Sequence, residues 1–214
     1  MTSTQQPQPL LPTRNDPASP LHYPAAQTCL LLMDFQNFII EMCGPVGTAA
    51  VSQAKHMLDW AHKNDILVLH SIVDLGAPPA SNSKRKDRLI ALVDSLKKQP
   101  QAVAEHEDLA FNQHVTNDHI VLKTPGIISG LKARGAMELL AERGIKSLLI
   151  CGLSTSGCVL RTVVPATDDG FVVSVIRDAC ADPKEGLHEV LMGEVLGSRA
   201  WVVGGEEFRR EWEG

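Results

Sequence analysis

The chain has 214 residues, of which 44% are hydrophobic, so it is long enough to fold as one domain around a sizeable core. Its formal net charge of −5 gives no electrostatic basis for binding nucleic acid or an anionic membrane, and no apolar stretch is long enough to span a bilayer. Its 5 cysteines are odd in number and lack a Cys-x-x-Cys pair, which argues against a disulfide framework and a structural zinc site and favours a reducing, cytoplasmic location.

The first 26 residues differ in composition from the rest. They are rich in Pro, Gln, Ser and Thr, and they lack the charged region and apolar core of a secretory signal. We therefore predict a flexible N-terminal tail over residues 1–26 and a single domain over residues 27–214.

The apolar run Cys29–Met33 then predicts a strand buried on both faces. Cys43, which precedes Gly44, is predicted to lie in a loop near the surface.

Strands and helices alternate along the rest of the chain. Repeated strand–helix units with apolar strands predict an α/β fold. In this three-layer αβα arrangement, a mainly parallel, Rossmann-like six-stranded sheet lies between two layers of helices. Further strands are predicted over Ile66–Leu69, Ile120–Leu122, Ser147–Ile150, Phe171–Ile176 and Ala200–Val203, and helices over Thr48–His62, Leu89–Leu96, 131–143, the residues after Cys158, and Leu187–Leu196.

The most informative segment is Gly152–Val159, which lies between two apolar runs. Its pattern is typical of a strand, a tight turn and a helix, with Cys158 at the start of the helix. The positive end of a helix dipole favours a thiolate over a thiol. The segment therefore predicts an activated nucleophile.

Two further side chains end predicted strands at the same edge of the sheet, where parallel α/β sheets gather their chemistry. Asp34 is placed to accept the proton of Cys158, and Lys123 to hold that carboxylate and stabilise the thiolate. His70 is the alternative base, because histidine more often partners a cysteine nucleophile. Taken singly, the three residues are explained better as a structural thiol, a turn residue and a surface charge. Their joint placement favours a catalytic site.

Three stretches in this order give the chain a specific resemblance. They are Leu30–Asn37, Ile120–Lys123 and Ile150–Val159, and a later Asp178-Ala179-Cys180 also fits. On these motifs the chain resembles the isochorismatase-like cysteine hydrolase family over roughly residues 27–205.

The resemblance implies a catalytic triad of Asp34, Lys123 and Cys158. It also implies a non-proline cis peptide at Leu153–Ser154, which would aim the N–H groups of Ser154 and Cys158 at one point as an oxyanion hole. The implied activity is that of a metal-independent cysteine hydrolase, which cleaves a small amide or carbamoyl-type substrate through a thioester. Two alternatives remain: isochorismate hydrolysis to a dihydroxybenzoate and pyruvate, and a non-catalytic oligomeric binding protein with this fold.

The chain departs from the nicotinamidase branch of that family, which carries an Asp-x-His-x-His metal site after the second strand. Here Ser71–Pro79 contains no histidine, so we predict neither a metal nor a cofactor. The resemblance also implies a homodimer or homotetramer. Pocket selectivity is expected to depend on residues 74–118 and on the neighbourhood of Ser129. Four polar residues are candidate substrate contacts, with backbone capping as the alternative: Gln36, Asn37, Thr155 and Ser156.

Overall fold

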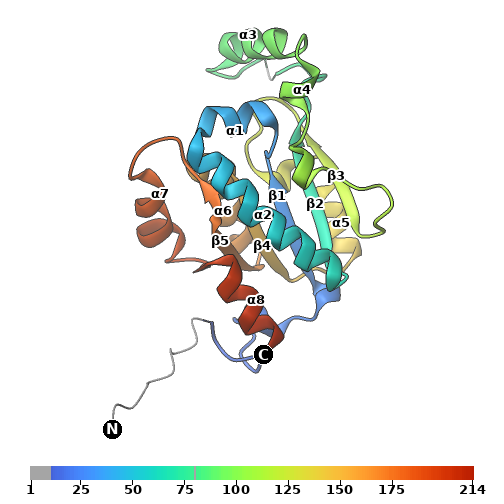
Figure 1. Ribbon diagram of the computed structural model, residues 1–214, viewed down its shortest axis with the longest axis vertical. Helices are drawn as coiled ribbons and strands as arrows, with labels where there is room; N and C mark the ends of the chain where they lie inside the picture. Colours follow the sequence, from blue (N-terminus) through green and yellow to red (C-terminus); the bar gives the residue numbers. More distant parts are fainter. Residues whose placement is uncertain (1–10, 80) are drawn as a thin grey trace.

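A six-stranded sheet runs through the centre of the computed structural model, which describes residues 11–79 and 81–214 (Figure 1). Every strand pairing is parallel, and the strand order is β3-β2-β1-β4-β5-β6. The predicted α/β class and parallel sheet are confirmed. The strands are β1 (Thr28–Met33), β2 (Leu67–Val73), β3 (Asp118–Lys123), β4 (Ser147–Leu153), β5 (Val172–Ala181) and β6 (Trp201–Val203).

Helices cover both faces of the sheet, as the three predicted layers require (Figure 1). On one face, side chains of the helices share a core with Leu30 and Leu32 of β1, and on the other with Leu31 and Met33. Alternate residues of a strand point to opposite faces, so the uninterrupted apolar run of β1 supplies both cores. The first face carries α1 (Asn37–Cys43), α2 (Pro45–Lys63) and α8 (Gly205–Glu213), and the second carries α5 (Ala136–Glu142), α6 (Leu160–Asp168) and η6 (Leu191–Leu196).

The connection between β2 and β3 carries a separate small layer. Figure 1 shows α3 (Lys86–Leu96) at the upper end of the molecule, beyond α1 and α4 (Pro100–Val103).

Within the described residues, no helix combines the length and the apolar character needed to cross a bilayer. The shorter elements are η1 (Pro20–His22), η2 (Ala25–Gln27), η3 (Glu107–Leu109), η4 (Gly130–Lys132), η5 (Thr155–Val159) and α7 (Leu187–Val190).

Glycines move two predicted helix boundaries. The helix predicted over 131–143 begins only at Ala136, because Gly135 has a left-handed backbone with φ 80°. The helix predicted after Cys158 begins at Leu160, because Gly157 has a non-helical backbone and Thr155–Val159 form a wider π-type turn. The helix α1 was not predicted. Its last residue, Cys43, is buried, so the prediction of a loop thiol near the surface is wrong.

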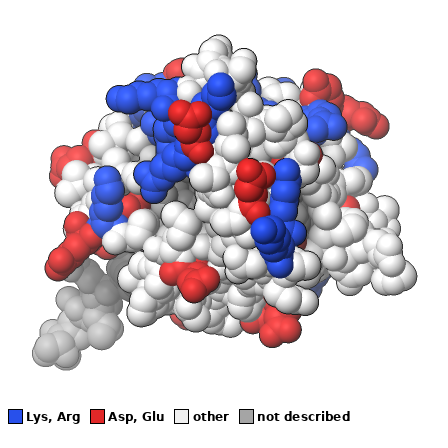
Figure 2. All heavy atoms as spheres, turned by 90° about the horizontal axis from the view of Figure 1, so that it is seen from above, with Lys and Arg blue, Asp and Glu red and all other residues white. Residues whose placement is uncertain are grey.

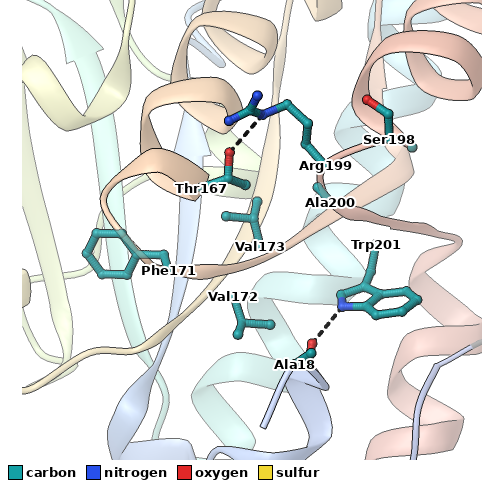
Figure 3. A pocket seen from close by; sticks show the side chains of 10 residues that line it. Ala18, Thr167, Phe171, Val172, Val173, Ser198, Arg199, Ala200 and Trp201 are labelled. Carbon is teal, nitrogen blue, oxygen red and sulfur yellow. Dashed lines mark hydrogen bonds between the residues drawn. The ribbon is translucent and has the colours of Figure 1, made fainter. Parts of the chain in front are cut away.

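The first described residues lie along the body of the protein. Leu11 and Ser19 are buried, and the Trp201 indole N–H donates to the Ala18 carbonyl at 2.8 Å (Figure 3). A cavity of about 390 Å³ lies beside this bond, at the amino ends of β5 and β6. Of the tail predicted over 1–26, residues 1–10 lie outside the described residues, and residues 11–26 make these packing contacts.

Candidate active site

The predicted triad meets at one point of the sheet edge. Asp34 follows β1, and Cys158 follows the neighbouring strand β4, so the two residues flank the place where the strand order reverses. Such a switch point in a parallel sheet opens a crevice between the loops that leave it in opposite directions. Lys123 ends β3, two strands away from β1, and its side chain reaches across the end of β2.

Lys123 and Asp34 form a buried ion pair. The Lys123 ammonium donates to Asp34 Oδ2 at 2.7 Å and to the Ile128 carbonyl at 3.1 Å, and only 1% of the lysine is exposed. Asp34 has a left-handed backbone with φ 63°, which is uncommon outside glycine, and its N–H donates to the Ser71 carbonyl at 3.0 Å. These contacts fix the carboxylate over the end of β1, and they exclude the surface-charge interpretation of Lys123.

Burial and the neighbouring lysine act on Asp34 in opposite directions. Burial raises the pKa of the Asp34 carboxyl, and the Lys123 charge and hydrogen bond oppose that rise, with a smaller contribution from Cys158. Its second oxygen, Oδ1, is buried and has no hydrogen-bond partner of normal geometry within the described part of the chain. An unsatisfied buried carboxylate oxygen beside a thiol is a ready proton acceptor.

The Cys158 thiol is neutral at rest. Burial raises its pKa well above the ordinary value, the Asp34 charge raises it further, and Lys123 opposes both effects. The predicted stabilisation of a resting thiolate by the helix N-terminus is therefore wrong: α6 starts only at Leu160, and burial beside a carboxylate outweighs a helix dipole. The thiol donates to the Leu153 carbonyl at 3.2 Å.

Gly152 has no side chain, and this leaves room for the Cys158 thiol. A Cβ atom at this position would lie 3.1 Å from Cys158 Sγ and 3.0 Å from Met33 Cβ, closer than nearly all real contacts. The position belongs to β4, where every residue is buried, so neighbouring side chains have little room to give way.

The turn that carries Cys158 is held from outside. The peptide bond between Leu153 and Ser154 is cis, as the resemblance implied. The Ser156 N–H donates to Asp182 Oδ2 at 2.8 Å, and Thr155 Oγ1 lies 2.8 Å from His188 Nδ1. Thr155 and Ser156 are thus engaged within the protein, and neither lines the adjoining cavity.

That cavity of about 280 Å³ opens beside the triad. Asp34, Ser154 and Gly157 line it, as do Ser83 and Arg85, and most of the remaining wall is apolar. The wall includes residues from both regions expected to set selectivity, together with α1, which the sequence analysis missed. Its principal apolar residues are Phe38, Ile39 and Met42 of α1, Leu89, Leu92 and Val93 of α3, and Leu75, Ile127, Ile128 and Pro183.

Gln36 and Asn37 bind the backbone of the protein and do not line the cavity. The Gln36 side chain accepts from Val73 N–H at 2.9 Å and donates to the Val103 carbonyl at 2.8 Å, while Asn37 Nδ2 donates to the Gln101 carbonyl at 2.9 Å. These two side chains therefore bind α4, the helix that follows α3, and Gln36 also connects it to β2. These contacts favour a structural role over substrate contact, although the Gln36 side chain does not cap α1, the helix that follows it.

His70 is not a base for Cys158. Its side chain shares the face of Leu32, with which it is paired in register, whereas Cys158 belongs to the opposite core. His70 Nδ1 lies 2.9 Å from Glu105 Oε1, and Nε2 lies 3.6 Å from Asp118 Oδ2. Burial lowers the pKa of His70, but contacts with Asp118 and Glu105 raise it overall to about 9. A histidine held cationic between two carboxylates has no lone pair to offer.

No group of three or more His, Cys, Asp or Glu side chains that could hold a metal ion occurs in residues 11–79 and 81–214. All 5 cysteines are free and buried. The groups that this arrangement brings together are the thiol of Cys158, the carboxylate of Asp34 and the ammonium of Lys123.

Known proteins resemble the chain over most of its length. A profile of the isochorismatase domain matches residues 28–207. The maleamate amidohydrolase of Pseudomonas putida is 27% identical over 173 residues, which is 78% of each chain. A cysteine hydrolase from Pseudomonas syringae pv. phaseolicola has a similar structure, with a TM-score of 0.72, 20% identity and coverage of 97% of this chain and 99% of that one. An uncharacterized isochorismatase family protein of Bacillus subtilis, YddQ, is 34% identical over 79 residues, and this match spans only 32% of this chain and 44% of that protein.

Proposed function

Because the chain belongs to the isochorismatase family, we propose that it is a hydrolase of a small amide or carbamoyl-type substrate, in which Asp34, Lys123 and Cys158 form the catalytic triad. The observation that carries this proposal is the buried Lys123–Asp34 pair, 2.7 Å long, whose carboxylate interacts with the buried Cys158 thiol. Asp34 is the member of this group that lines the cavity, together with the neighbours of Cys158 in the chain, Ser154 and Gly157. The amide class is supported by the relative named maleamate amidohydrolase, which covers most of the chain.

In the proposed first step, Asp34 takes the proton of Cys158 as the sulfur attacks the carbonyl carbon. The high pKa of the thiol suits this order, since the proton then leaves only when a substrate is in place. Lys123 keeps Asp34 available as an acceptor in spite of its burial. A new C–S bond forms, and the carbonyl oxygen becomes an oxyanion.

We propose that the N–H groups of Ser154 and Cys158 hold that oxyanion. Ser154 lines the cavity beside Asp34, and donors placed where charge develops stabilise the transition state. Collapse of the tetrahedral intermediate breaks the C–N bond, and Asp34 gives its proton to the departing amine. A thioester on Cys158 remains.

Water completes the cycle. Asp34 accepts a proton from the water that attacks the thioester carbon, the C–S bond breaks, and the sulfur recovers its proton. The products are an acid and an amine or ammonia, and each group of the triad returns to its starting state. No metal or cofactor is needed for these steps.

A substrate panel tests the reaction class. It should include maleamate, nicotinamide, N-carbamoyl acids, biuret and isochorismate, each assayed with wild type and with Cys158→Ala. We expect release of ammonia from at least one amide by wild type only. Cleavage of isochorismate alone, or equal rates in Cys158→Ala, would contradict the proposal.

The resemblance also leads us to propose a homodimer or homotetramer that works in the cytoplasm without nucleic-acid or membrane partners. Light scattering tests the first part, since the chain mass is 23.2 kDa. A monomer across the micromolar range would contradict it.

A further inference from the structure

A second buried thiol, which the proposed hydrolysis does not use, lies beside the nucleophile. The register between β4 and β5 shifts after Ile150, and the shift places Cys180 opposite Gly152, where an unbroken ladder would place Arg177. Irregularities of this kind re-aim a side chain. Here a cysteine takes the position beside the glycine that leaves room for the Cys158 thiol.

The two sulfur atoms are neighbours on one face of the sheet. Cys158 Sγ lies 3.1 Å from the position that a Cβ atom would take at Gly152. Neighbouring strands are about 4.8 Å apart, and Cys180 is the partner of Gly152 on the next strand. Cys180 Sγ points back toward β4, since it lies 3.8 Å from the Ile150 carbonyl oxygen. Two thiols of the same core therefore flank a residue that has no side chain to separate them.

The other cysteines are placed differently. All 5 cysteines are free, and all lie in the part of the chain that the structure describes. Cys43 and Cys151 belong to the core on the opposite face of the sheet. Cys29 shares the core of Cys158 but lies near the amino end of β1, whereas Cys158 follows the carboxyl end of β4. Among the described residues, Cys180 is therefore the thiol within reach of the nucleophile.

Cavities approach this pair from two sides. Leu153, Ser154 and Gly157, which precede Cys158 in the chain, line the cavity beside the triad. Cys180 lines a second cavity, of about 520 Å³, at the carboxyl end of β5. Figure 2 looks down on the end of the molecule that carries α3 and shows acidic and basic side chains mixed over this face. Mixed charge does not favour a charged oxidant, and the cavities have room for a small neutral one such as hydrogen peroxide.

We propose that Cys158 and Cys180 form a reversible disulfide when the protein meets a hydroperoxide, with Cys180 as the resolving thiol. A resolving cysteine beside an oxidised nucleophile converts its sulfenic acid into a disulfide, which reductants reverse. Without such a partner, the sulfenic acid is oxidised further to a sulfinic acid, which thiol reductants do not restore. The disulfide is therefore a protected and inactive form of the nucleophile.

The two thiols have different roles because only Cys158 interacts with a base. Burial raises the pKa of Cys180 to about 12, so the first oxidation falls on Cys158, whose proton Asp34 takes as the sulfur attacks a peroxide oxygen. The O–O bond breaks, the departing hydroxide recovers that proton as water, and Cys158 becomes a sulfenic acid. Cys180 sulfur then attacks Cys158 sulfur, the S–S bond forms, and the S–O bond breaks. The second hydroxide leaves as water with the Cys180 proton, so one hydrogen peroxide is reduced to two waters as two thiols are oxidised.

Peptide mass spectrometry under non-reducing conditions tests the pair. Trypsin leaves Cys151 and Cys158 together in peptide 147–161, and Cys180 in peptide 178–184. After treatment with hydrogen peroxide and alkylation of the remaining thiols, we expect these two peptides to be linked in wild type. We expect the same link in Cys151→Ala, which assigns the bond to Cys158. Cys151→Ala is also the matched control, because it removes an equally buried thiol from the opposite core.

In Cys180→Ala we expect loss of the link and a sulfinic acid on Cys158, which dithiothreitol does not reverse. Absence of the link from wild type, or its loss in Cys151→Ala, would overturn the inference. Sulfinic acid that forms on Cys158 equally fast in wild type and Cys180→Ala would also overturn it. These measurements need no amide substrate, so a failure of the proposed hydrolysis is detected separately, by the substrate panel.

Discussion

Replacing Lys123 by methionine should leave a buried carboxylate without its counterion. Breaking one side of a buried pair typically costs about 3–5 kcal/mol, and Lys123 is 1% exposed and Asp34 7% exposed, so the upper part of that range applies at neutral pH. The group responds by keeping its proton. In the variant, burial still raises the pKa of Asp34, and the opposing charge is gone.

The sign of the pH dependence follows from this shift. An unfolded aspartate loses its proton near pH 3.9, while the buried Asp34 of the variant keeps its proton to a higher pH. Between those two values the folded variant binds more protons than its unfolded state, so its stability falls by up to about 1.4 kcal/mol per pH unit as the pH rises. The pKa of Asp34 is also raised in wild type, but Lys123 opposes that rise, so wild type loses stability over a narrower range of pH. Below about pH 4, both states are protonated and the difference shrinks to the loss of packing.

Urea unfolding from pH 4 to pH 8 measures this difference. Lys132→Met is the control, because Lys132 is exposed, and we expect it to change stability by no more than about 0.5 kcal/mol. The double variant Lys123→Met/Asp34→Asn should recover most of the loss at pH 7, since no buried charge remains. A cost below about 1 kcal/mol, or a double variant no more stable than the single one, would refute the account of the pair.

Two further predictions concern His70 and Gly152. The pKa of His70 rises from 6.5 to about 9 in the folded protein, so its contribution to stability is complete below pH 6.5 and is lost as the pH rises through about 9. Urea unfolding from pH 6 to pH 10 should show this loss in wild type and not in His70→Asn. Equal pH profiles of the two proteins would contradict the prediction. In Gly152→Ala the added methyl meets Cys158 Sγ and Met33 Cβ, so we expect a stability loss of about 1–3 kcal/mol and a marked fall in kcat. At Gly193 an added Cβ meets nothing within 4 Å, so Gly193→Ala is the control; equal effects of the two substitutions would show that the close contacts at Gly152 are not the cause.

The sheet, and the meeting of Asp34 and Lys123 at its edge, could be predicted because both depend on local patterns. β1 and β4 are buried at every position, so their apolar runs stand out in the sequence. Asp34 and Lys123 are recognisable as strand ends once the strands are placed. Parallel strands bring their carboxyl ends to one edge, which is why residues 89 positions apart meet.

The failures concern effects that only packing decides. The charge state of Cys158 depends on burial and on Asp34, so a helix-start pattern could not give it. His70 is held by Glu105, 35 residues away in a loop without regular pattern. The helix α1 is hard to recognise because it is only seven residues long and begins three residues after Asp34, although Phe38, Ile39 and Met42 have helical spacing.

The thioester on Cys158 is the most direct test of the proposed function. The amide that the substrate panel shows to turn over fastest should be mixed with enzyme, quenched in acid within the first turnovers and examined by intact-protein and peptide mass spectrometry. We predict an adduct of the acyl mass on the peptide that contains Cys158, and neither adduct nor turnover in Cys158→Ala. Turnover at the wild-type rate in Cys158→Ala, or an acyl adduct on any other residue, would contradict the account.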